Sequence, residues 1–181
     1  MVRRYRMPVV VWIPTLTTHR LRLVPPRIAD FEGYAAIVTS ERGRFVDGPM
    51  TREEAWLDFS QMVAGWVLRG FGALTLRRRD GEEYLGTVLV HHEDGDPEPE
   101  LGWLLTASAE GHGIAFEAAV VMRDWAFEHA GLERLASYID PANSRAIALA
   151  ERLGGVLQTG PVGAVTYIYT SQKDPARPLR S

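Results

Sequence analysis

The chain of 181 residues contains no cysteine, which excludes disulfide bonds, thiolate nucleophiles and cysteine metal ligands. It also lacks an excess of positive charge, because 23 acidic residues outnumber 20 lysines and arginines and leave a net charge of −3. This balance gives no basic field for nucleic acid, and no basic amphipathic segment indicates a membrane surface. No apolar run approaches the roughly 20 residues of a membrane span. The partners to be expected therefore include neither nucleic acid nor membrane.

The length is typical of one domain, and 46% hydrophobic with 24% charged residues is typical of a globular protein. The first 14 residues are basic and then apolar, which faintly imitates a signal peptide. Their apolar part is short, lies between Pro8 and Pro14, and lacks a small-residue cleavage site. We therefore expect a cytoplasmic protein with a poorly ordered leader at 1–14, starting at Met1 or Met7. A domain over 15–171 and a frayed tail over 172–181 complete the expected organisation.

Apolar periodicity and turn residues predict alternating strands and helices. Asp30 suits the N-cap of a first helix, and Thr51 with Glu54 forms a capping box for a second helix that ends before Gly70. A tight turn at Asp80-Gly81 is expected between two strands. The expected strands are 20–24, 73–79, 84–91, 101–105, 134–139, 156–157 and 165–170, and the expected helices are 31–38, 51–69, 114–130 and 143–153.

The resulting order is β-α-α-β-β-β-α-β-α-β-β. It predicts a single α/β domain with one mixed, mostly antiparallel sheet of about seven strands and about four helices on its faces. No internal repeat or interior linker interrupts this pattern.

The most informative stretch is 101–123, LGWLLTASAEGHGIAFEAAVVMR. An apolar strand leads into a loop with Gly111-His112-Gly113, and the loop opens directly into a helix. Two glycines let the backbone approach a ligand closely, and the first turn of a helix has N–H groups without helical partners, which favours an anion. A pair of glycines alone is also common in ordinary turns, so neighbouring residues must decide between the two interpretations.

Those neighbours make the chain resemble the GCN5-related N-acetyltransferase (GNAT) superfamily, within it the ribosomal-protein-alanine N-acetyltransferase (RimJ/RimL-like) branch. The likeness covers about 16–170. It includes Leu101-Gly-Trp-Leu before the glycine loop, the loop Glu110-Gly-His-Gly-Ile-Ala115, and Glu117-Ala118 after it. A later run from Asp140-Pro-Ala-Asn143 to Ala150-Glu-Arg-Leu-Gly154 is also similar to the family.

The resemblance implies an acetyl-CoA-dependent enzyme that acetylates an amine by direct attack, with no metal and no covalent enzyme intermediate. The pyrophosphate would lie on backbone N–H groups of the loop and the helix start, while the pantetheine arm would lie beside the strand that ends at Thr106. Asn143 matches the family asparagine that bonds the arm, and it also suits a helix N-cap. The residues implied for acetyl-CoA binding are Leu104, Leu105, Thr106, Gly111, His112, Gly113, Ile114, Ala115 and Asn143.

Two positions depart from the family pattern. Glu110 stands where the family prefers glutamine or arginine, and its carboxylate would either repel a phosphate or point into solvent. Ala146 and Ala150 stand where the family often has a serine or a tyrosine that protonates the leaving thiolate. Water or another group must then supply that proton, or catalysis has been lost.

Glu100 is the first candidate for the base that deprotonates the attacking ammonium, and its alternative role is an exposed carboxylate at a strand end. Tyr138 is the candidate for a second acid or base, and its alternative role is a core tyrosine with a bonded hydroxyl. His91 and His92 are adjacent in a strand, so their side chains point to opposite faces and no metal site is expected. Arg42, in the loop before the second helix, is among the candidates for substrate contact by location alone.

The sequence thus predicts an acetyl-CoA:amine N-acetyltransferase whose acceptor is a peptide N-terminus or a small-molecule amine. The alternative from another class is a non-catalytic acyl-CoA-binding or sensing module, suggested by Glu110, Ala146 and Ala150. Dimers are common in the family, which leaves a homodimer open without an interface that the sequence identifies. Motifs of P-loop nucleotidases and serine hydrolases are absent.

Overall fold

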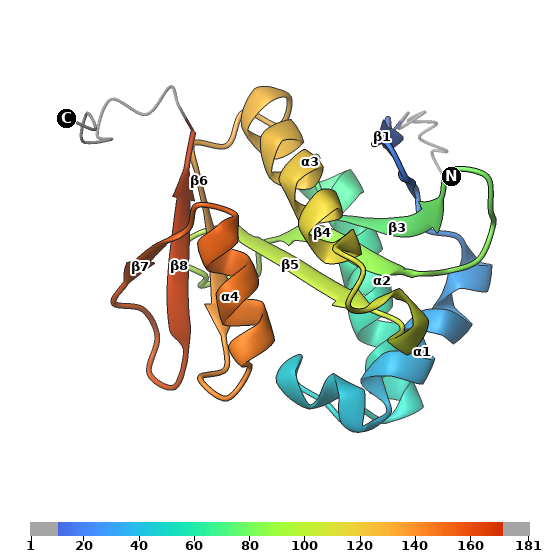
Figure 1. Cartoon of the computed structure of the whole chain (residues 1–181), viewed down its shortest axis with the longest axis horizontal. Helices are drawn as coiled ribbons and strands as arrows, with labels where there is room; N and C mark the ends of the chain where they lie inside the picture. Colours follow the sequence, from blue (N-terminus) through green and yellow to red (C-terminus); the bar gives the residue numbers. More distant parts are fainter. Residues whose placement is uncertain (1–10, 172–181) are drawn as a thin grey trace, which may run out of the picture.

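A computed structural model of the chain describes residues 11–171, which form one sheet with helices on both faces (Figure 1). The expected tail at 172–181 and most of the expected leader lie outside the described residues. The sheet has eight strands in the order β1-β2-β3-β4-β5-β6-β8-β7. All pairs of neighbours are antiparallel except β5 and β6, which are parallel. The expected α/β fold class is confirmed.

The element bounds agree closely with the sequence analysis. The strands are β1 Leu16–Thr17, β2 Leu21–Val24, β3 Ala73–Arg78, β4 Gly86–His91, β5 Glu100–Leu105, β6 Arg134–Ile139, β7 Val156–Gln158 and β8 Val165–Thr170. The α-helices are α1 Phe31–Val38, α2 Arg52–Leu68, α3 Ile114–Glu128 and α4 Ser144–Arg152, and the short 3-10 helices are η1 Ile28–Asp30, η2 Glu41–Phe45 and η3 Ala107–Ala109. The additional strand β1 was not predicted, because two residues are too short for a periodicity to register.

Most helix ends follow the local chemistry expected from the sequence. Thr51 and Glu54 form the capping box of α2, and Gly70 with φ of 82° follows its last turn. Gly131, after α3, has φ of 72°. The prediction for Asp30 was wrong, because its carboxylate makes no cap bond to α1.

The Asp30 carboxylate instead lies in the protein interior. It pairs with Arg77 of β3 and accepts a hydrogen bond from Thr75 Oγ1 at 3.0 Å. The side chains of Asp30 and Arg77 are 4% and 6% exposed. A buried carboxylate needs a counter-charge more than a helix needs this cap, so the ion pair decides its orientation.

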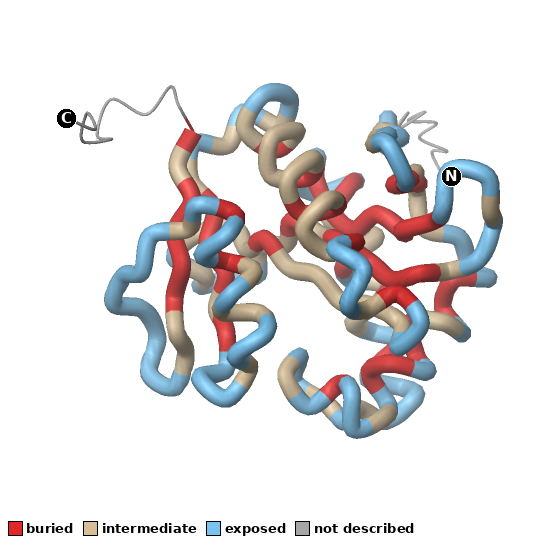
Figure 2. The backbone as a smooth tube through the Cα atoms, in the orientation of Figure 1, coloured by how far each residue is buried: buried red, intermediate tan, exposed pale blue. Residues whose placement is uncertain are grey.

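The two faces of the sheet carry separate apolar layers. On one face, α3 packs on the sheet through residues such as Ala118, Met122 and Ala126, all fully buried. On the other face, α1 and α2 enclose a smaller cluster that includes Phe59 and Met62. Figure 2 shows the buried trace concentrated in the strands and the inner side of α3, with exposed segments at the connecting loops. No helix within 11–171 is long and apolar enough to cross a membrane.

The parallel pair β5 and β6 is the one irregular join in this sheet. β4 and β5 pair along six positions, whereas β5 and β6 pair at the single position Glu100–Ala136. Ser137 Oγ donates to the Leu101 carbonyl at 2.6 Å, and beyond that contact the two strands diverge (Figure 1). The divergence opens the sheet on the side where α4 begins, and it positions the candidate site.

Candidate active site

A cleft of about 550 Å³ occupies the opening between β5 and β6. Its walls come from both halves of the chain, with α1, α2, β4 and the loop after η2 on one side and β6, the start of α4 and the loop before β8 on the other. Four of the predicted site residues line it, namely Glu100, Leu104, Tyr138 and Asn143. The topology therefore brings the two candidate catalytic residues and part of the expected cofactor set to one place.

The backbone of β5 alternates between its two neighbours. The N–H of Thr106 donates to the Leu85 carbonyl at 2.9 Å, and the antiparallel register with β4 continues from that pair. Even-numbered residues of β5 therefore exchange hydrogen bonds with β4, whereas odd-numbered ones face β6. Trp103 and Leu105 thus direct main-chain groups into the opening, where β6 has diverged.

This alternation corrects part of the expected cofactor contacts. The backbone groups of Leu104 and Thr106 are directed to β4, so the expectation that they bond an extended ligand is wrong for these two residues. Leu104 contributes its side chain to the cleft instead. The backbone groups of Trp103, which is not among the residues expected to bind acetyl-CoA, face the opening instead, because the register of β5 with β4 alternates with every residue.

The glycine loop has the geometry expected of an anion site. Gly111 and Gly113 have φ of 78° and 73°, a region that L side chains rarely adopt, and a Cβ at Gly111 would meet no atom within 4 Å. The helix α3 begins directly after Gly113, with Ile114 buried and Ala115 half-buried. The first N–H groups of α3 have no partner within the helix and face the same loop. These features leave room for a phosphate against the backbone.

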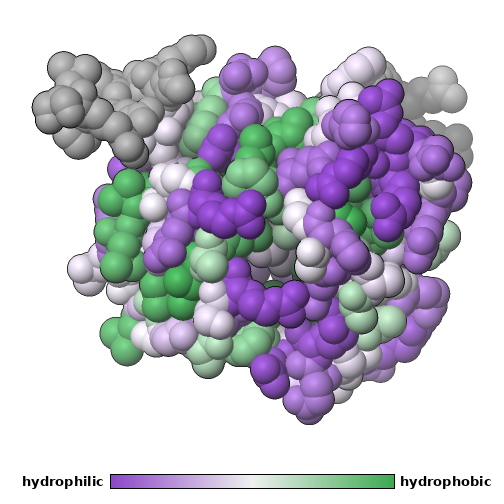
Figure 3. All heavy atoms as spheres, viewed as in Figure 1, coloured by the Kyte–Doolittle hydropathy of each residue, from purple (hydrophilic) through white to green (hydrophobic). Residues whose placement is uncertain are grey.

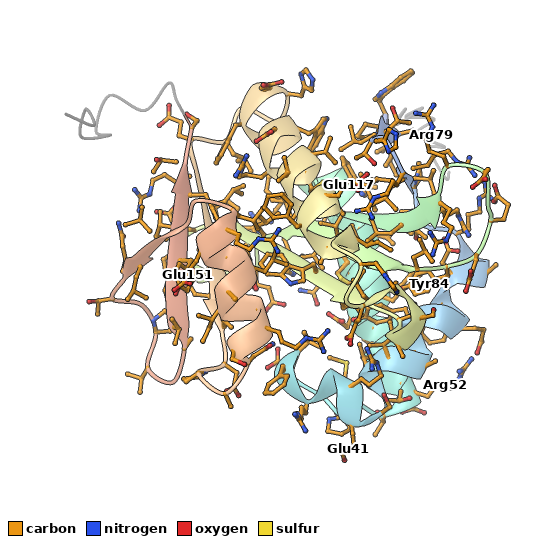
Figure 4. All side chains as sticks on the ribbon, in the orientation of Figure 1. Glu41, Arg52, Arg79, Tyr84, Glu117 and Glu151 are labelled. Atoms are coloured by element: carbon orange, nitrogen blue, oxygen red, sulfur yellow. The ribbon has the colours of Figure 1, made fainter. Side chains whose placement is uncertain are left out.

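The N-terminus of α3 is tied to the segment before β2. Glu117, on the first turn of α3 (Figure 4), accepts hydrogen bonds from Thr18 Oγ1 and from the Arg20 backbone N–H, the latter at 3.0 Å. The Arg20 guanidinium pairs with the same carboxylate at 2.6 Å and donates to the His112 carbonyl at 2.9 Å. His112 therefore takes part in this anchor through its backbone carbonyl, and Arg20 links Glu117 to the glycine loop.

Glu100 is a shielded carboxylate rather than an exposed strand end. Burial raises its pKa to about 7, and the nearby carboxylates of Asp96, Asp47 and Glu93 add to the rise. The backbone N–H of Tyr138 donates to the Glu100 carboxylate and opposes it. A carboxyl group that titrates near neutral pH can both accept and release a proton, which suits a general base.

Tyr138 lies beside Glu100 on the neighbouring strand. Its hydroxyl is buried and has no hydrogen-bond partner among the described residues. Burial also raises the pKa of Tyr138, so the hydroxyl is protonated at neutral pH. The expected alternative of a core tyrosine with a bonded hydroxyl is not what the structure shows: Tyr138 lines the cleft, and its buried O–H has an unused donor.

Asn143 and the two alanines after it occupy the α4 side. Asn143 lines the cleft, and its side-chain oxygen accepts from the Ala146 N–H at 3.1 Å as the N-cap of α4. Ala146 also lines the cleft, whereas Ala150 is fully buried in the core. Neither alanine can donate a proton.

Some residues of the cleft were missed from the sequence. Asp58 of α2 lines it and accepts a hydrogen bond from Tyr34 of α1. Burial raises the pKa of Asp58. No motif marks this aspartate in the sequence, because a single carboxylate on a helix has no local signal of its own. Within 11–171, no three histidine or acidic side chains gather closely enough to hold a metal ion.

The raised pKa of Glu100 leads to a prediction about stability. The folded protein holds the Glu100 proton up to about pH 7, whereas the unfolded chain releases it near the ordinary value of 4.5. The stability that this proton confers is complete below pH 4.5 and is lost as the pH rises through 7. Glu100→Gln is therefore expected to raise the free energy of unfolding at pH 8 by on the order of 1 to 3 kcal/mol and to change it little at pH 4.5. Urea unfolding at both pH values measures this, and equal effects at the two would contradict it.

Comparison with known proteins gives a family model and several similar proteins. A family model described as "Acetyltransferase (GNAT) domain" matches residues 20–156. The crystal structure of an acetyltransferase from Agrobacterium tumefaciens str. C58 is similar with a TM-score of 0.85 and 40% identity, over 92% of this chain and 100% of that chain. Ribosomal-protein-S5-alanine acetyltransferase from Vibrio fischeri shares the fold with a TM-score of 0.69 at 17% identity, over 92% of this chain and 100% of that chain.

Mycothiol acetyltransferase from Salinispora arenicola (strain CNS-205) is 33% identical over 125 residues. The match covers 63% of this chain and 35% of that protein, so the chain spans about a third of that relative's length. The family model covers more than half of the chain, and the structural matches span nearly all of it, whereas the match to the curated relative is partial.

Proposed function

This chain belongs to the GNAT acetyltransferase family, and from that membership we propose that it transfers an acetyl group from acetyl-CoA to a primary amine. The observation that carries the proposal is the divergence of β5 and β6 after the pair Glu100–Ala136, beside the glycine loop at the start of α3. A long, thin donor with phosphates at one end fits an opening in a sheet that leads to a helix N-terminus. The expected domain over 15–171 is part of this proposal.

The residues of the opening suit the two ends of such a donor. Loop residues Gly111 to Ala115 would receive the pyrophosphate through backbone N–H groups, because the two glycines leave the backbone uncovered. The outward N–H groups of Trp103 and Leu105 would bond the pantetheine arm, and Asn143 faces it from α4. One of the N–H groups of β5 would stabilise the oxyanion that forms as the amine attacks.

Proton transfer is assigned to the side chains at the bottom of the cleft. Glu100 would take a proton from the acceptor ammonium, and the amine nitrogen would then bond to the acetyl carbon and form the oxyanion. The carbon–sulfur bond would break as the oxyanion collapses, and the nitrogen would lose its second proton to water. The leaving thiolate takes a proton from Tyr138 or from water, since Ala146 and Ala150 offer none. Acetyl-CoA supplies the activated thioester, and no metal is needed.

The acceptor end of the cleft is rich in negative charge. Asp47, Asp58, Glu93, Glu100 and Asp140 line it, against Arg44 and His91. This excess favours an acceptor that arrives as a cation, either a small-molecule amine or a peptide N-terminus. A cytoplasmic location and a homodimer stay predictions that accompany this function.

The first test is a calorimetric titration with acetyl-CoA of the wild type and Gly113→Trp. The wild type is expected to show saturable binding, and the variant to lose it, because the indole would cover the loop backbone and strain a φ of 73°. Gly131→Trp is the matched control, since Gly131 has φ of 72° and open space around it but lies at the far end of α3. It should bind as the wild type does.

Absence of binding in the wild type would contradict the proposed function. Binding followed by CoA release that depends on an added amine would establish the enzyme, and the alternative of a non-catalytic acyl-CoA-binding module requires binding without release for every amine and peptide of the panel. The observation behind this alternative is that Ala146 and Ala150 of α4 cannot protonate the leaving thiolate.

A further inference from the structure

The carboxylate of Glu110 joins two ion pairs that connect η2, the loop before α3 and the first turn of α4. One oxygen of Glu110 contacts Arg42 of η2, and the other lies 2.9 Å from Nη1 of Arg145 on the first turn of α4. Of the two expected alternatives, a carboxylate that points freely into solvent is wrong, because Glu110 is held by two ion pairs; its effect on a phosphate stays a prediction. We call the three residues Arg42, Glu110 and Arg145 the Arg–Glu–Arg bridge.

The Arg–Glu–Arg bridge lies between the two parts of the proposed cofactor site. Glu110 directly precedes Gly111 of the anion loop. Arg42 also donates to the Leu105 carbonyl at 3.3 Å, on the edge of β5 that faces the opening. Arg145 follows Asn143 by two residues at the α4 side. Figure 3 shows hydrophilic side chains around a small hollow in the middle of this face.

The charge and geometry of the bridge would allow the two guanidinium groups to exchange the Glu110 carboxylate for a phosphate group. The side chains of Arg42, Glu110 and Arg145 are 35%, 30% and 70% exposed, so each ion pair is only weakly stabilising. Two guanidinium groups and one carboxylate leave one uncompensated positive charge. A pyrophosphate offers the same forked acceptor geometry as a carboxylate with twice the charge, and arginine binds both groups in this way.

We propose that Arg42 and Arg145 bind the phosphate groups of acetyl-CoA and that Glu110 competes with those phosphates for both guanidinium groups. Glu110 thereby lowers the affinity of the site for acetyl-CoA. The inference rests on the proposed function. The family resemblance implies backbone N–H groups as the phosphate ligands, whereas here two arginine side chains are added as ligands and Glu110 as their competitor.

The test is a set of calorimetric titrations with CoA. Glu110→Gln removes the competitor and is expected to tighten CoA binding about fivefold, the sum of two weak ion pairs. Arg42→Gln and Arg145→Gln are each expected to weaken it severalfold. The effect of Glu110→Gln depends on the arginines, so it should vanish in the double variant Arg42→Gln/Arg145→Gln.

Glu41→Gln is the matched control, because it removes a negative charge from the same exposed turn without touching the bridge (Figure 4). Its CoA affinity should stay within twofold of the wild type. Equal or weaker CoA binding by Glu110→Gln would overturn the proposal. A fivefold gain that persists in the double arginine variant would also overturn it, since that gain would come from the loss of one negative charge near the site and not from the arginines. If the wild type binds no CoA, the proposed function fails. If the wild type binds CoA and Gly113→Trp does not, but the Glu110, Arg42 and Arg145 variants all bind as the wild type does, only the bridge proposal fails.

Discussion

Glu100→Gln is expected to lower the turnover number by about 100- to 1,000-fold while acetyl-CoA affinity changes little, because a general base contributes roughly that much to a proton transfer. Glutamine keeps the shape of the side chain and can still accept the Tyr138 N–H, but it cannot take a proton from an ammonium. Steady-state kinetics with the best amine of the panel, together with calorimetry, separates turnover from binding.

The pH profile is a second signature of the same residue. Since the base must be ionised and the pKa of Glu100 is raised to about 7, kcat/KM of the wild type should rise with pH through 7 and then level off. The residual activity of Glu100→Gln should lack that rise. Glu128→Gln, an exposed carboxylate at the end of α3, serves as the control and should keep both rate and profile. A variant at Glu100 with wild-type turnover would remove this residue from the mechanism.

Asp30→Asn is expected to lower the free energy of unfolding by about 3 kcal/mol, because it leaves the Arg77 guanidinium buried without its counter-charge. The amide keeps the size of the side chain, so the loss reports charge rather than packing. Arg77 retains a contact to the Glu82 carbonyl, and the exposed Glu82 carboxylate at 3.9 Å from its Nε compensates only in part. Equilibrium unfolding in urea at pH 7 measures the loss.

The control is the exposed ion pair of Glu32 with Arg52, which joins the neighbouring helix α1 to α2. Glu32→Gln should change stability little, since solvent screens both charges. Similar losses for Asp30→Asn and Glu32→Gln would show that burial does not distinguish the two pairs. A loss below about 1 kcal/mol for Asp30→Asn would contradict the prediction.

Much of the fold was accessible from sequence, because each element carries its own local signal. The bounds of β6 and β8 were predicted to the residue, and the capping box at Thr51 defined the start of α2. Asp30 shows the limit of such reasoning. Its local position favoured a helix cap, but its partner Arg77 is 47 residues away, and no local pattern reports a buried partner at that distance.

The candidate site divides in the same way. The glycine loop was predicted as a binding site because its residues are consecutive in the sequence. Glu100 was predicted as the base because its position matches the family pattern. Whether Trp103 or Leu104 directs its backbone into the opening depends on a register of strands, which alternates with every residue. The ionic partners of Glu110 come from η2 and α4, and only the folded chain brings these segments to the same loop.

The single pairing position between β5 and β6 also divides the hydrogen-bonded sheet into two parts. On one side lies a meander of β1 to β5 whose neighbours follow one another along the chain, and on the other a small unit of β6 to β8. The helix α3 is the covalent tie between them, and it packs on strands of the first unit. The opening is therefore a gap between two parts of the sheet, and a ligand that hydrogen-bonds to both β5 and β6 would make the sheet continuous across it.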